Sequence, residues 1–226
     1  MNDPERLRLA QVVGLASELI VAGRRTILGL AGAPGAGKSL LAEAIARAFP
    51  DSARVVGMDG FHLAQAELRR LGRIERKGAI DTFDADGYIA LLGRLRTPDT
   101  TTVYAPRFDR RLEEPIGSAL PVPPEVPLVV TEGNYLLVPD APWHEVRALL
   151  DVCWYVEPGE DVRLRRLIDR HRSFGLAPDE AFQRACGSDQ RNAELVASTR
   201  GRADRILTIT TTSVTPATPV APRRRR

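Results

Sequence analysis

Short apolar runs alternate along the chain with longer stretches in which hydrophobic residues recur every three or four positions. Short apolar runs bounded by turn residues are typical of buried strands, and the longer spacing is typical of helices with one buried face. The apolar runs predict strands at residues 26–31, 53–57, 127–131, 151–156 and 204–209. The amphipathic stretches predict helices at residues 5–21, 38–48, 63–71, 86–96, 143–149, 159–172 and 178–199.

This alternation of strands and helices predicts an α/β fold, with a parallel sheet of about five strands between flanking helices. The chain has 226 residues, of which 43% are hydrophobic, so it is long enough to bury one full core. We therefore expect a single domain over residues 1–210. Residues 211–226, "TTSVTPATPVAPRRRR", are rich in Thr and Pro and show no apolar period. This composition predicts a disordered tail that ends in four arginines.

The net charge of the whole chain says little about its folded part, because the positive excess comes from the tail. The formal net charge is +3, and Arg223 to Arg226 alone contribute four positive charges. Nucleic-acid binding usually requires a basic face on the folded domain, so we do not expect a nucleic-acid partner. No apolar run reaches the length of about 20 residues that spans a membrane, and the start, "MNDPERLRLA", lacks a signal-peptide core. We expect a cytoplasmic protein.

The segment 32–39, "GAPGAGKS", matches G-x-x-x-x-G-K-[ST] and lies between a predicted strand and a predicted helix. Glycines let backbone N–H groups turn toward phosphate oxygens at the positive end of the helix. Lys38 can then approach the β- and γ-phosphates of a nucleotide, and the Ser39 hydroxyl can ligate Mg²⁺. The alternative is a glycine-rich turn without a ligand. The expected nucleotide-binding residues are Gly32, Ala33, Pro34, Gly35, Ala36, Gly37, Lys38, Ser39 and Leu40.

Lysine usage supports a special role for Lys38. Lys38 and Lys77 are the only lysines among 32 basic residues. Because the chain otherwise uses arginine for positive charge, a retained lysine indicates a site that requires an ammonium group.

Two predicted strands end in acidic residues, in "RVVGMDGFH" at Asp59 and in "PLVVTEGNY" at Glu132. The carboxyl ends of parallel strands converge on the ligand crevice, so both carboxylates are expected near the phosphates. One acid can accept a proton from an acceptor hydroxyl, and the other can hold Mg²⁺. The alternative for each is to cap the helix that follows. The chain contains no N-K-x-D guanine motif and no S-G-G-Q transporter signature.

The ordered set "GAPGAGKS", "MDGFH", "RKGAIDTFD", "VYAPRFDR" and "VTEGNYLL" resembles the phosphoribulokinase, uridine kinase and bacterial pantothenate kinase group of P-loop kinases. The likeness runs from Thr26 to Asp204. It implies the three-layer P-loop NTPase fold with a mobile lid, ATP as phosphoryl donor, and a small-molecule hydroxyl acceptor. It also implies Asp59 as general base and Glu132 as a carboxylate on the magnesium or substrate side. Relatives in this group often form homodimers.

Further candidates surround the acceptor. Segment 76–84 offers a basic pair and two acids, although Asp84 is equally well placed to cap the following helix. "VYAPRFDR" resembles the acceptor-side loop of the family, although Tyr104 could serve only in packing. The expected acceptor-binding residues are His62, Arg76, Lys77, Asp81, Tyr104, Arg107, Glu132 and Asn134.

The arginine-rich segment 160–175 is the lid candidate, since Arg163, Arg166 and Arg170 fall on one helix face. The stripe could instead be a solvated surface. As a lid, it would bring Arg166 or Arg170 over the triphosphate. The segment "TRGRAD" resembles the family's adenine-side segment and makes Arg202 a nucleotide-contact candidate.

Together these residues predict an ATP- and Mg²⁺-dependent kinase that phosphorylates a hydroxyl of a nucleoside-, pantothenate- or sugar-like acceptor. The expected catalytic residues are Lys38, Asp59, Arg166 and Arg170, and the expected metal contacts are Ser39 and Glu132. The alternative is a regulatory or transport-associated protein that uses the P-loop as a nucleotide-dependent switch. A nucleic-acid-dependent ATPase is a third reading.

Overall fold

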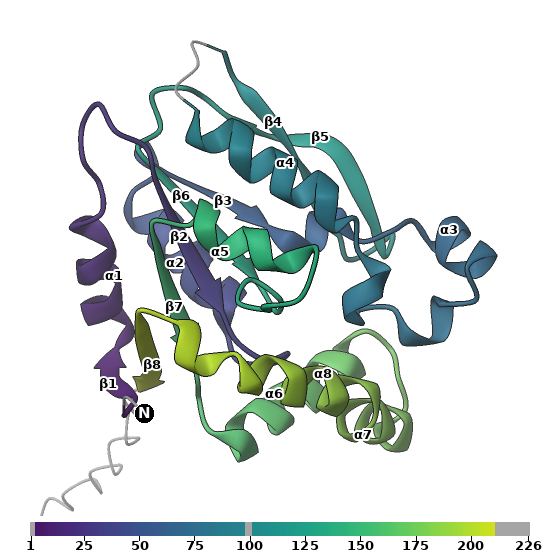
Figure 1. The fold of residues 1–226 in the computed structure, drawn as a ribbon. Helices are drawn as coiled ribbons and strands as arrows, with labels where there is room; N and C mark the ends of the chain where they lie inside the picture. The colour runs from purple at the N-terminus through teal and green to yellow at the C-terminus, as the bar shows by residue number, and fades with distance from the viewer. Residues whose placement is uncertain (1–2, 98–100, 211–226) are drawn as a thin grey trace, which may run out of the picture.

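The computed structural model describes residues 3–97 and 101–210, shown as a ribbon in Figure 1. The strands are β1 Glu5–Arg8, β2 Thr26–Ala31, β3 Ala53–Gly57, β4 Val103–Asp109, β5 Glu114–Val122, β6 Leu128–Gly133, β7 Val152–Val156 and β8 Arg205–Thr210. The α-helices are α1 Leu9–Ser17, α2 Lys38–Ala48, α3 Gln65–Arg70, α4 Ala85–Arg96, α5 Val146–Leu149, α6 Glu160–Ser173, α7 Pro178–Cys186 and α8 Ser188–Ser198. The short 3₁₀ turns are η1 Met58–Phe61, η2 Ile74–Arg76, η3 Ile80–Thr82, η4 Trp143–Glu145 and η5 Arg200–Arg202.

Six strands form one parallel sheet in the order β1-β8-β7-β2-β6-β3. The predicted parallel α/β fold is therefore confirmed, with one strand more than the five expected. The six residues of β2, "TILGLA", are all buried. Ile27 and Ala31 contribute to the core on one face of the sheet, and Leu28 and Leu30 contribute to the core on the other. Because both faces are covered, the strand is a continuous apolar run.

Helices cover both faces of the sheet, which is the expected three-layer arrangement (Figure 1). Helices α1 and α2 pack on one face through Val12, Ala16, Leu41 and Ile45. Helices α4, α5 and α8 contribute to the core on the other face, which includes a cluster of aromatic side chains around Tyr88. In the described part of the chain, no helix combines the length and apolar character needed to cross a membrane.

The sequence prediction was wrong for residues 5–8, which form β1 rather than the start of a helix. They pair in parallel with β8, from Glu5 with Leu207 to Arg8 with Thr210. An unpaired strand edge offers backbone donors and acceptors, and pairing with such an edge outweighs the weak helical preference of four residues. Helix α1 consequently starts at Leu9 and ends at Ser17, before the predicted end at residue 21.

The hairpin of β4 and β5 was also missed. The two strands pair antiparallel from Val103 with Val122 to Asp109 with Glu114, with a register shift between Ala105 and Arg107. Prolines at positions 106, 115 and 121 argue against strands in the sequence, yet an isolated two-stranded hairpin has free edges that tolerate them.

The predicted helix over residues 178–199 is two helices, α7 and α8, which meet at Gly187. A Cβ atom at position 187 would lie 2.8 Å from the Gln183 carbonyl oxygen, so the break depends on a glycine. The predicted tail, residues 211–226, lies outside the described residues.

Candidate active site

The P-loop follows β2 and leads directly into α2. Gly35 and Gly37 have φ angles of +82° and +98°, in the left-handed region that favours glycine. A Cβ atom at Gly35 would lie 2.7 Å from the Arg163 carbonyl oxygen of the lid. Helix α2 has no side-chain cap and no acidic residue in its first turn. Its first N–H groups are therefore available to an anion, and the loop fits a phosphate group.

Lys38 is buried at the base of this loop, with 7% of its surface exposed. Its Nζ donates to the Gly32 carbonyl oxygen at 2.7 Å, to the Ala33 carbonyl oxygen at 3.1 Å and to Asn134 Oδ1 at 2.8 Å. Burial lowers the pKa of Lys38 to about 8, although Glu132 and Asp59 oppose this shift. The ammonium group is held by neutral oxygens, so its charge is available to a phosphate.

The two strand-end acids lie on neighbouring strands, as predicted from the sheet. Glu132 pairs in register with Gly57 of β3, and Asp59 follows two residues later in η1. Glu132 Oε1 accepts a hydrogen bond from Ser39 Oγ at 3.1 Å. Asp59 forms an ion pair with Arg110 and lies 4.0 Å from His62 Nδ1.

The environment shifts the pKa values of these two carboxyls in opposite directions. Burial raises the pKa of Glu132, and the nearby charge of Asp59 adds to this effect. Burial alone would also raise the pKa of Asp59, but His62, Arg110 and Lys38 outweigh it and hold the pKa below its usual range. These neighbouring positive charges favour the ionised form of Asp59.

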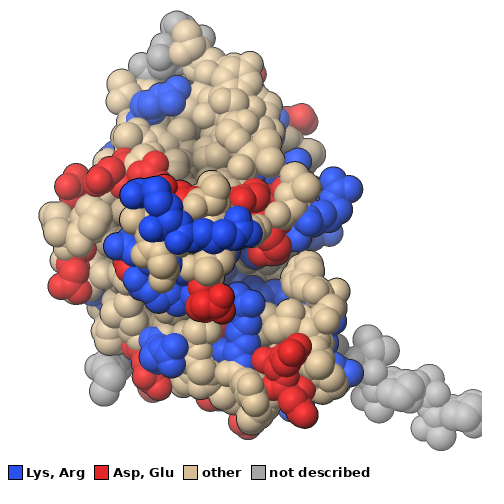
Figure 2. Space-filling model, turned by 90° about the vertical axis from the view of Figure 1, so that its right-hand side faces the viewer, with Lys and Arg blue, Asp and Glu red and all other residues tan. Residues whose placement is uncertain are grey.

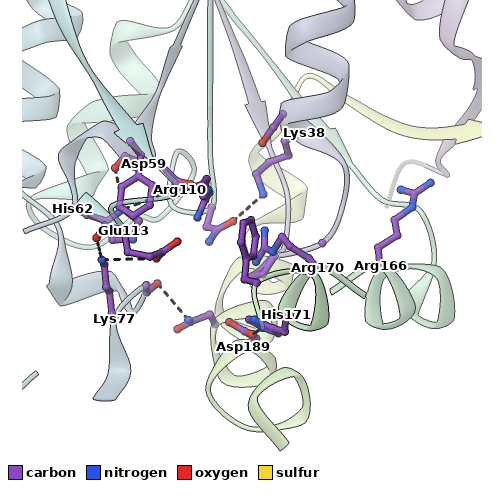
Figure 3. Close-up of a pocket in the computed structure, with 18 of the residues that line it drawn as sticks. Lys38, Asp59, His62, Lys77, Arg110, Glu113, Arg166, Arg170, His171 and Asp189 are labelled. Atoms are coloured by element: carbon purple, nitrogen blue, oxygen red, sulfur yellow. Dashed lines mark hydrogen bonds and ion pairs between the residues drawn. The ribbon is translucent and has the colours of Figure 1, made fainter. Parts of the chain in front are cut away.

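A cavity of about 890 Å³ connects these groups. It is bounded by the P-loop, by η1, by the loop at Lys77 and Gly78, by the β4–β5 turn and by the helices α6 to α8. Figure 3 shows Lys38 and Arg166 on one side of the cavity and Lys77 and Glu113 on the other, with Arg170 between them. The cavity therefore has a P-loop end and an opposite end.

The lid arginines divide into one structural residue and two cavity residues. Arg163 is buried, with 3% of its surface exposed, and it binds the Pro34 carbonyl oxygen, Glu160 and Gln190. Arg166 lines the cavity and donates to the Ala36 carbonyl oxygen at 3.4 Å. Arg170 also lines the cavity, and its side chain has no hydrogen bond or ion pair with another described residue.

Four of the expected acceptor residues line the cavity: His62, Lys77, Glu132 and Asn134. The other four are not brought there. Arg76 and Asp81 form an ion pair with each other outside the cavity lining. Tyr104 is 55% exposed, because the inward positions of this part of β4 are Val103 and Ala105. Arg107 is also exposed, because the register shift between Ala105 and Arg107 interrupts the alternation of the strand.

Arg202 and Asp84 also lie outside the cavity lining. The Arg202 carbonyl oxygen accepts a hydrogen bond from Arg147 just before the start of β8, and Arg147 also pairs with Asp204. Arg202 thus lines neither this cavity nor the smaller hollow beside the P-loop. Asp84 accepts a hydrogen bond from the Gly87 backbone at 2.9 Å, so it is the N-cap of α4, one of the two roles expected for it.

Several cavity residues were not identified from the sequence. They include Phe108, Arg110, Arg111, Glu113, His171, Arg184, Asp189 and Asn192. Arg110 lies three residues from the expected Arg107, and only the hairpin register decides which of the two faces the cavity. Asn192 of α8 donates to the Gly78 carbonyl oxygen at 3.3 Å, which ties α8 to the loop opposite the P-loop.

No protein-family model matches the chain. The chain is 32% identical over 207 residues to a Schizosaccharomyces pombe protein whose name assigns it to the uridine kinases, C227.14, covering 87% of this chain and 88% of that protein. It is also 32% identical to the YggC protein of Escherichia coli, covering 83% of this chain and 79% of YggC.

Solved structures agree with these relatives. A Silicibacter sp. TM1040 protein named for a fructose transport system kinase is 38% identical, with a TM-score of 0.76 and coverage of 88% of this chain and 98% of that chain. This chain is a P-loop kinase of the phosphoribulokinase, uridine kinase and bacterial pantothenate kinase group. The resemblance inferred from the motifs is thus confirmed. The kinase is a phosphotransferase that uses ATP, and the kinases related to it act on small-molecule acceptors.

Proposed function

We propose that this kinase transfers the γ-phosphoryl group of ATP to a hydroxyl group of a small acceptor bound at the end of the cavity opposite the P-loop. The observation that carries this proposal is the position of Asp59. Its carboxylate lies at the cavity wall, is favoured in its ionised form by neighbouring positive charges, and is close enough to Lys38 for each to affect the pKa of the other. A base at this place can serve a hydroxyl that faces the P-loop phosphates.

The nucleotide would extend from the P-loop into a second hollow of about 650 Å³. This hollow shares Gly37, Leu40 and Arg166 with the main cavity, and it is completed by residues of β1, α1 and β8. Leu40 is largely exposed there and offers an apolar surface to a base. We place the adenosine part of ATP in this hollow, whereas the sequence resemblance had suggested the segment of Arg202.

The residues present also fit Mg²⁺. The Ser39 hydroxyl and the Glu132 carboxylate are joined by a hydrogen bond of 3.1 Å, and both would supply oxygen ligands to the ion. No group of three or more His, Cys, Asp or Glu residues in the described chain could hold a metal ion by itself. Mg²⁺ keeps several waters and uses substrate phosphates, so one hydroxyl and one carboxylate suit it. When bound, it would neutralise phosphate charge.

The chain's own groups account for the transfer. The acceptor oxygen forms a bond to the γ-phosphorus, and the bond from that phosphorus to the bridging oxygen of ADP breaks. The hydroxyl proton passes to the Asp59 carboxylate. Lys38 and the N–H groups of the P-loop hold the phosphates, and Arg166 and Arg170 neutralise the charge that develops in the transition state. We assign these functions to one kinase domain formed by residues 1–210.

The test compares two variants in ATP consumption with Mg²⁺ and a panel of hydroxyl acceptors. Asp59→Asn keeps the size of the side chain and removes the base, so we expect the loss of acceptor phosphorylation with ATP affinity retained. Lys38→Met should lose ATP binding itself. In a protein that uses ATP only as a regulatory signal, Asp59→Asn would leave ATP consumption with the acceptors unchanged. That result would overturn the proposal.

A further inference from the structure

Some of the lysine and arginine side chains that line the main cavity have a carboxylate partner, and others have none. Seven of the residues that line the main cavity are lysine or arginine, and four are aspartate or glutamate. Lys38, Arg166 and Arg170 belong to the P-loop and to the lid helix that packs on it. The other four cations are Lys77, Arg110, Arg111 and Arg184, and they lie on the loop at Lys77 and Gly78, on the β4–β5 turn and on α7.

Most carboxylates near this end are already engaged. Asp59 is paired with Arg110, and Asp189 Oδ2 is 2.7 Å from His171 Nε2. Arg111 is 3.7 Å from Asp109, and its side chain is 90% exposed, so it belongs to the rim of the cavity. Of the four cations at this end, Arg184 has no ion pair with another described residue, and Lys77 has only a long one, with Glu113.

The Lys77 side chain is held in place mainly by a backbone carbonyl oxygen rather than by a close carboxylate. Its side chain is 11% exposed, and its Nζ donates to the backbone carbonyl oxygen of Glu113. The Glu113 carboxylate is 3.9 Å away, at the outer limit of an ion pair, and about half of that side chain is exposed. The ammonium also lies 5.0 Å from the centre of the Phe108 ring. Burial lowers the pKa of Lys77, although the charges of Glu113 and Glu114 oppose this shift.

Arg184 projects from α7 into the same end of the cavity. Its side chain has no hydrogen bond or ion pair with another residue of the described chain. It lies close enough to Lys77 for its charge to disfavour the protonated lysine. Two like charges that converge on a cavity destabilise each other unless a ligand of opposite charge joins them.

We propose that the acceptor is an alcohol that carries an anionic group, a phosphate or a carboxylate, and that Lys77 and Arg184 bind this group. The proposal rests on the proposed kinase function and names the class of its acceptor. Arg184 supplies the planar donor fork that suits either anion, and Lys77 supplies a compact charge. Both lysines of the chain would then bind anions in one cavity, Lys38 the phosphates of ATP and Lys77 the acceptor.

Figure 2 shows basic side chains in a band across the middle of one face, with acidic side chains beside it. This face is therefore mixed in charge, and it is not continuously basic. Lys77 and Arg184 instead line the cavity, where they suit a small anion rather than a polyanion.

The test uses matched acceptors and matched variants. The full chain is assayed with ATP and Mg²⁺ on ribose and ribose 5-phosphate, and on glycerol, glycerate and glycerol 3-phosphate. We expect turnover with the anionic member of a pair. Turnover of ribose 5-phosphate or glycerol 3-phosphate indicates a site for a phosphate, and turnover of glycerate indicates a site for a carboxylate. Lys77→Met and Arg184→Ala should each raise the KM for that acceptor about 10- to 100-fold, as expected for one charge-assisted hydrogen bond, with the KM for ATP unchanged.

The control is Arg165→Ala, which removes an exposed arginine of α6 that lines neither hollow and should leave both KM values unchanged. Preference for the neutral member, with a KM insensitive to Lys77→Met and Arg184→Ala, would overturn the inference.

A binding experiment separates this inference from the kinase proposal. The protein is saturated with Mg²⁺ and a non-hydrolysable ATP analogue, so that the P-loop is filled, and it is then titrated with ribose 5-phosphate, glycerate or inorganic phosphate. Binding in the unmodified protein that is lost in Arg184→Ala supports the anion site even without turnover. Absence of binding by all three anions would overturn it.

Discussion

Arg110, at the turn between β4 and β5, forms an ion pair with Asp59, at the end of β3. The hairpin can place Arg110 there because η1 packs closely on β4, where a Cβ atom at Gly60 would lie 2.7 Å from the Pro106 carbonyl oxygen. The pair links the proposed base to a hairpin that is separate from the main sheet.

Removing Arg110 should therefore raise the pKa of Asp59. Arg110 is one of the charges that hold this pKa below its usual range, so Arg110→Gln removes a stabilisation of the ionised form. The Asp59 carboxyl should then gain its proton at a higher pH. The measurement is a pH titration of the carboxyl carbon signals by NMR, with Asp59→Asn to assign the resonance. Arg111→Gln, at an exposed neighbouring arginine, is the control, and equal titration curves for Asp59 in both variants would contradict the expectation.

ATP affinity should fall as the pH rises above about 8, where the buried Lys38 of the free protein loses its proton. The ammonium is the form that binds phosphate, so the dissociation constant should rise by up to about tenfold for each further pH unit. Calorimetric titration with ATP between about pH 6.5 and pH 9.5 measures this. In Lys38→Arg the charge persists at these pH values, and any remaining affinity should lack the alkaline decline. A constant affinity of the unmodified protein up to pH 9.5 would contradict this assignment.

Arg170→Ala should reduce kcat by about 100-fold or more, with little change in stability. The side chain forms no hydrogen bond or ion pair with another described residue, so its removal breaks no such interaction of the folded state. It lies instead within electrostatic range of Asp59 and Glu132. Initial rates with saturating ATP and thermal unfolding are measured together. Arg172→Ala, at an exposed position of α6 outside the cavity, is the control. Parallel losses of kcat and stability in Arg170→Ala would refute a role in transfer.

Arg163→Ala should instead lower the free energy of unfolding, by about 2–3 kcal/mol. Its guanidinium donates to the Pro34 carbonyl oxygen at 3.1 Å and to Glu160 Oε2 at 2.8 Å, and it also binds Gln190. These contacts join the P-loop to α6 and α8. Urea unfolding measures the loss. Arg163→Lys keeps the charge without the planar fork and should recover only part of the stability. If Arg163→Ala unfolds at the same urea concentration as the unmodified protein, the buried contacts contribute nothing to stability.

The sequence by itself determined the P-loop and the main sheet. Segment 32–39 specifies a strand, a turn and a helix within a short stretch, and its glycines and lysine act through local backbone geometry. The acids Asp59 and Glu132 could be placed together because parallel strands share their carboxyl edge. Apolar runs such as 26–31 predicted buried strands because both faces of the sheet are covered.

Only the tertiary structure decided which arginines reach the cavity and which strands pair at a distance. Arg163 and Arg170 share a helix face, yet one is buried in contacts with the P-loop and the other lines the cavity. Arg110 rather than Arg107 faces Asp59 because of the β4–β5 register. Residues 5–8 form a strand because β8 offers a free edge some 200 residues later. Each outcome depends on packing between segments far apart in the chain, which local residue patterns do not encode.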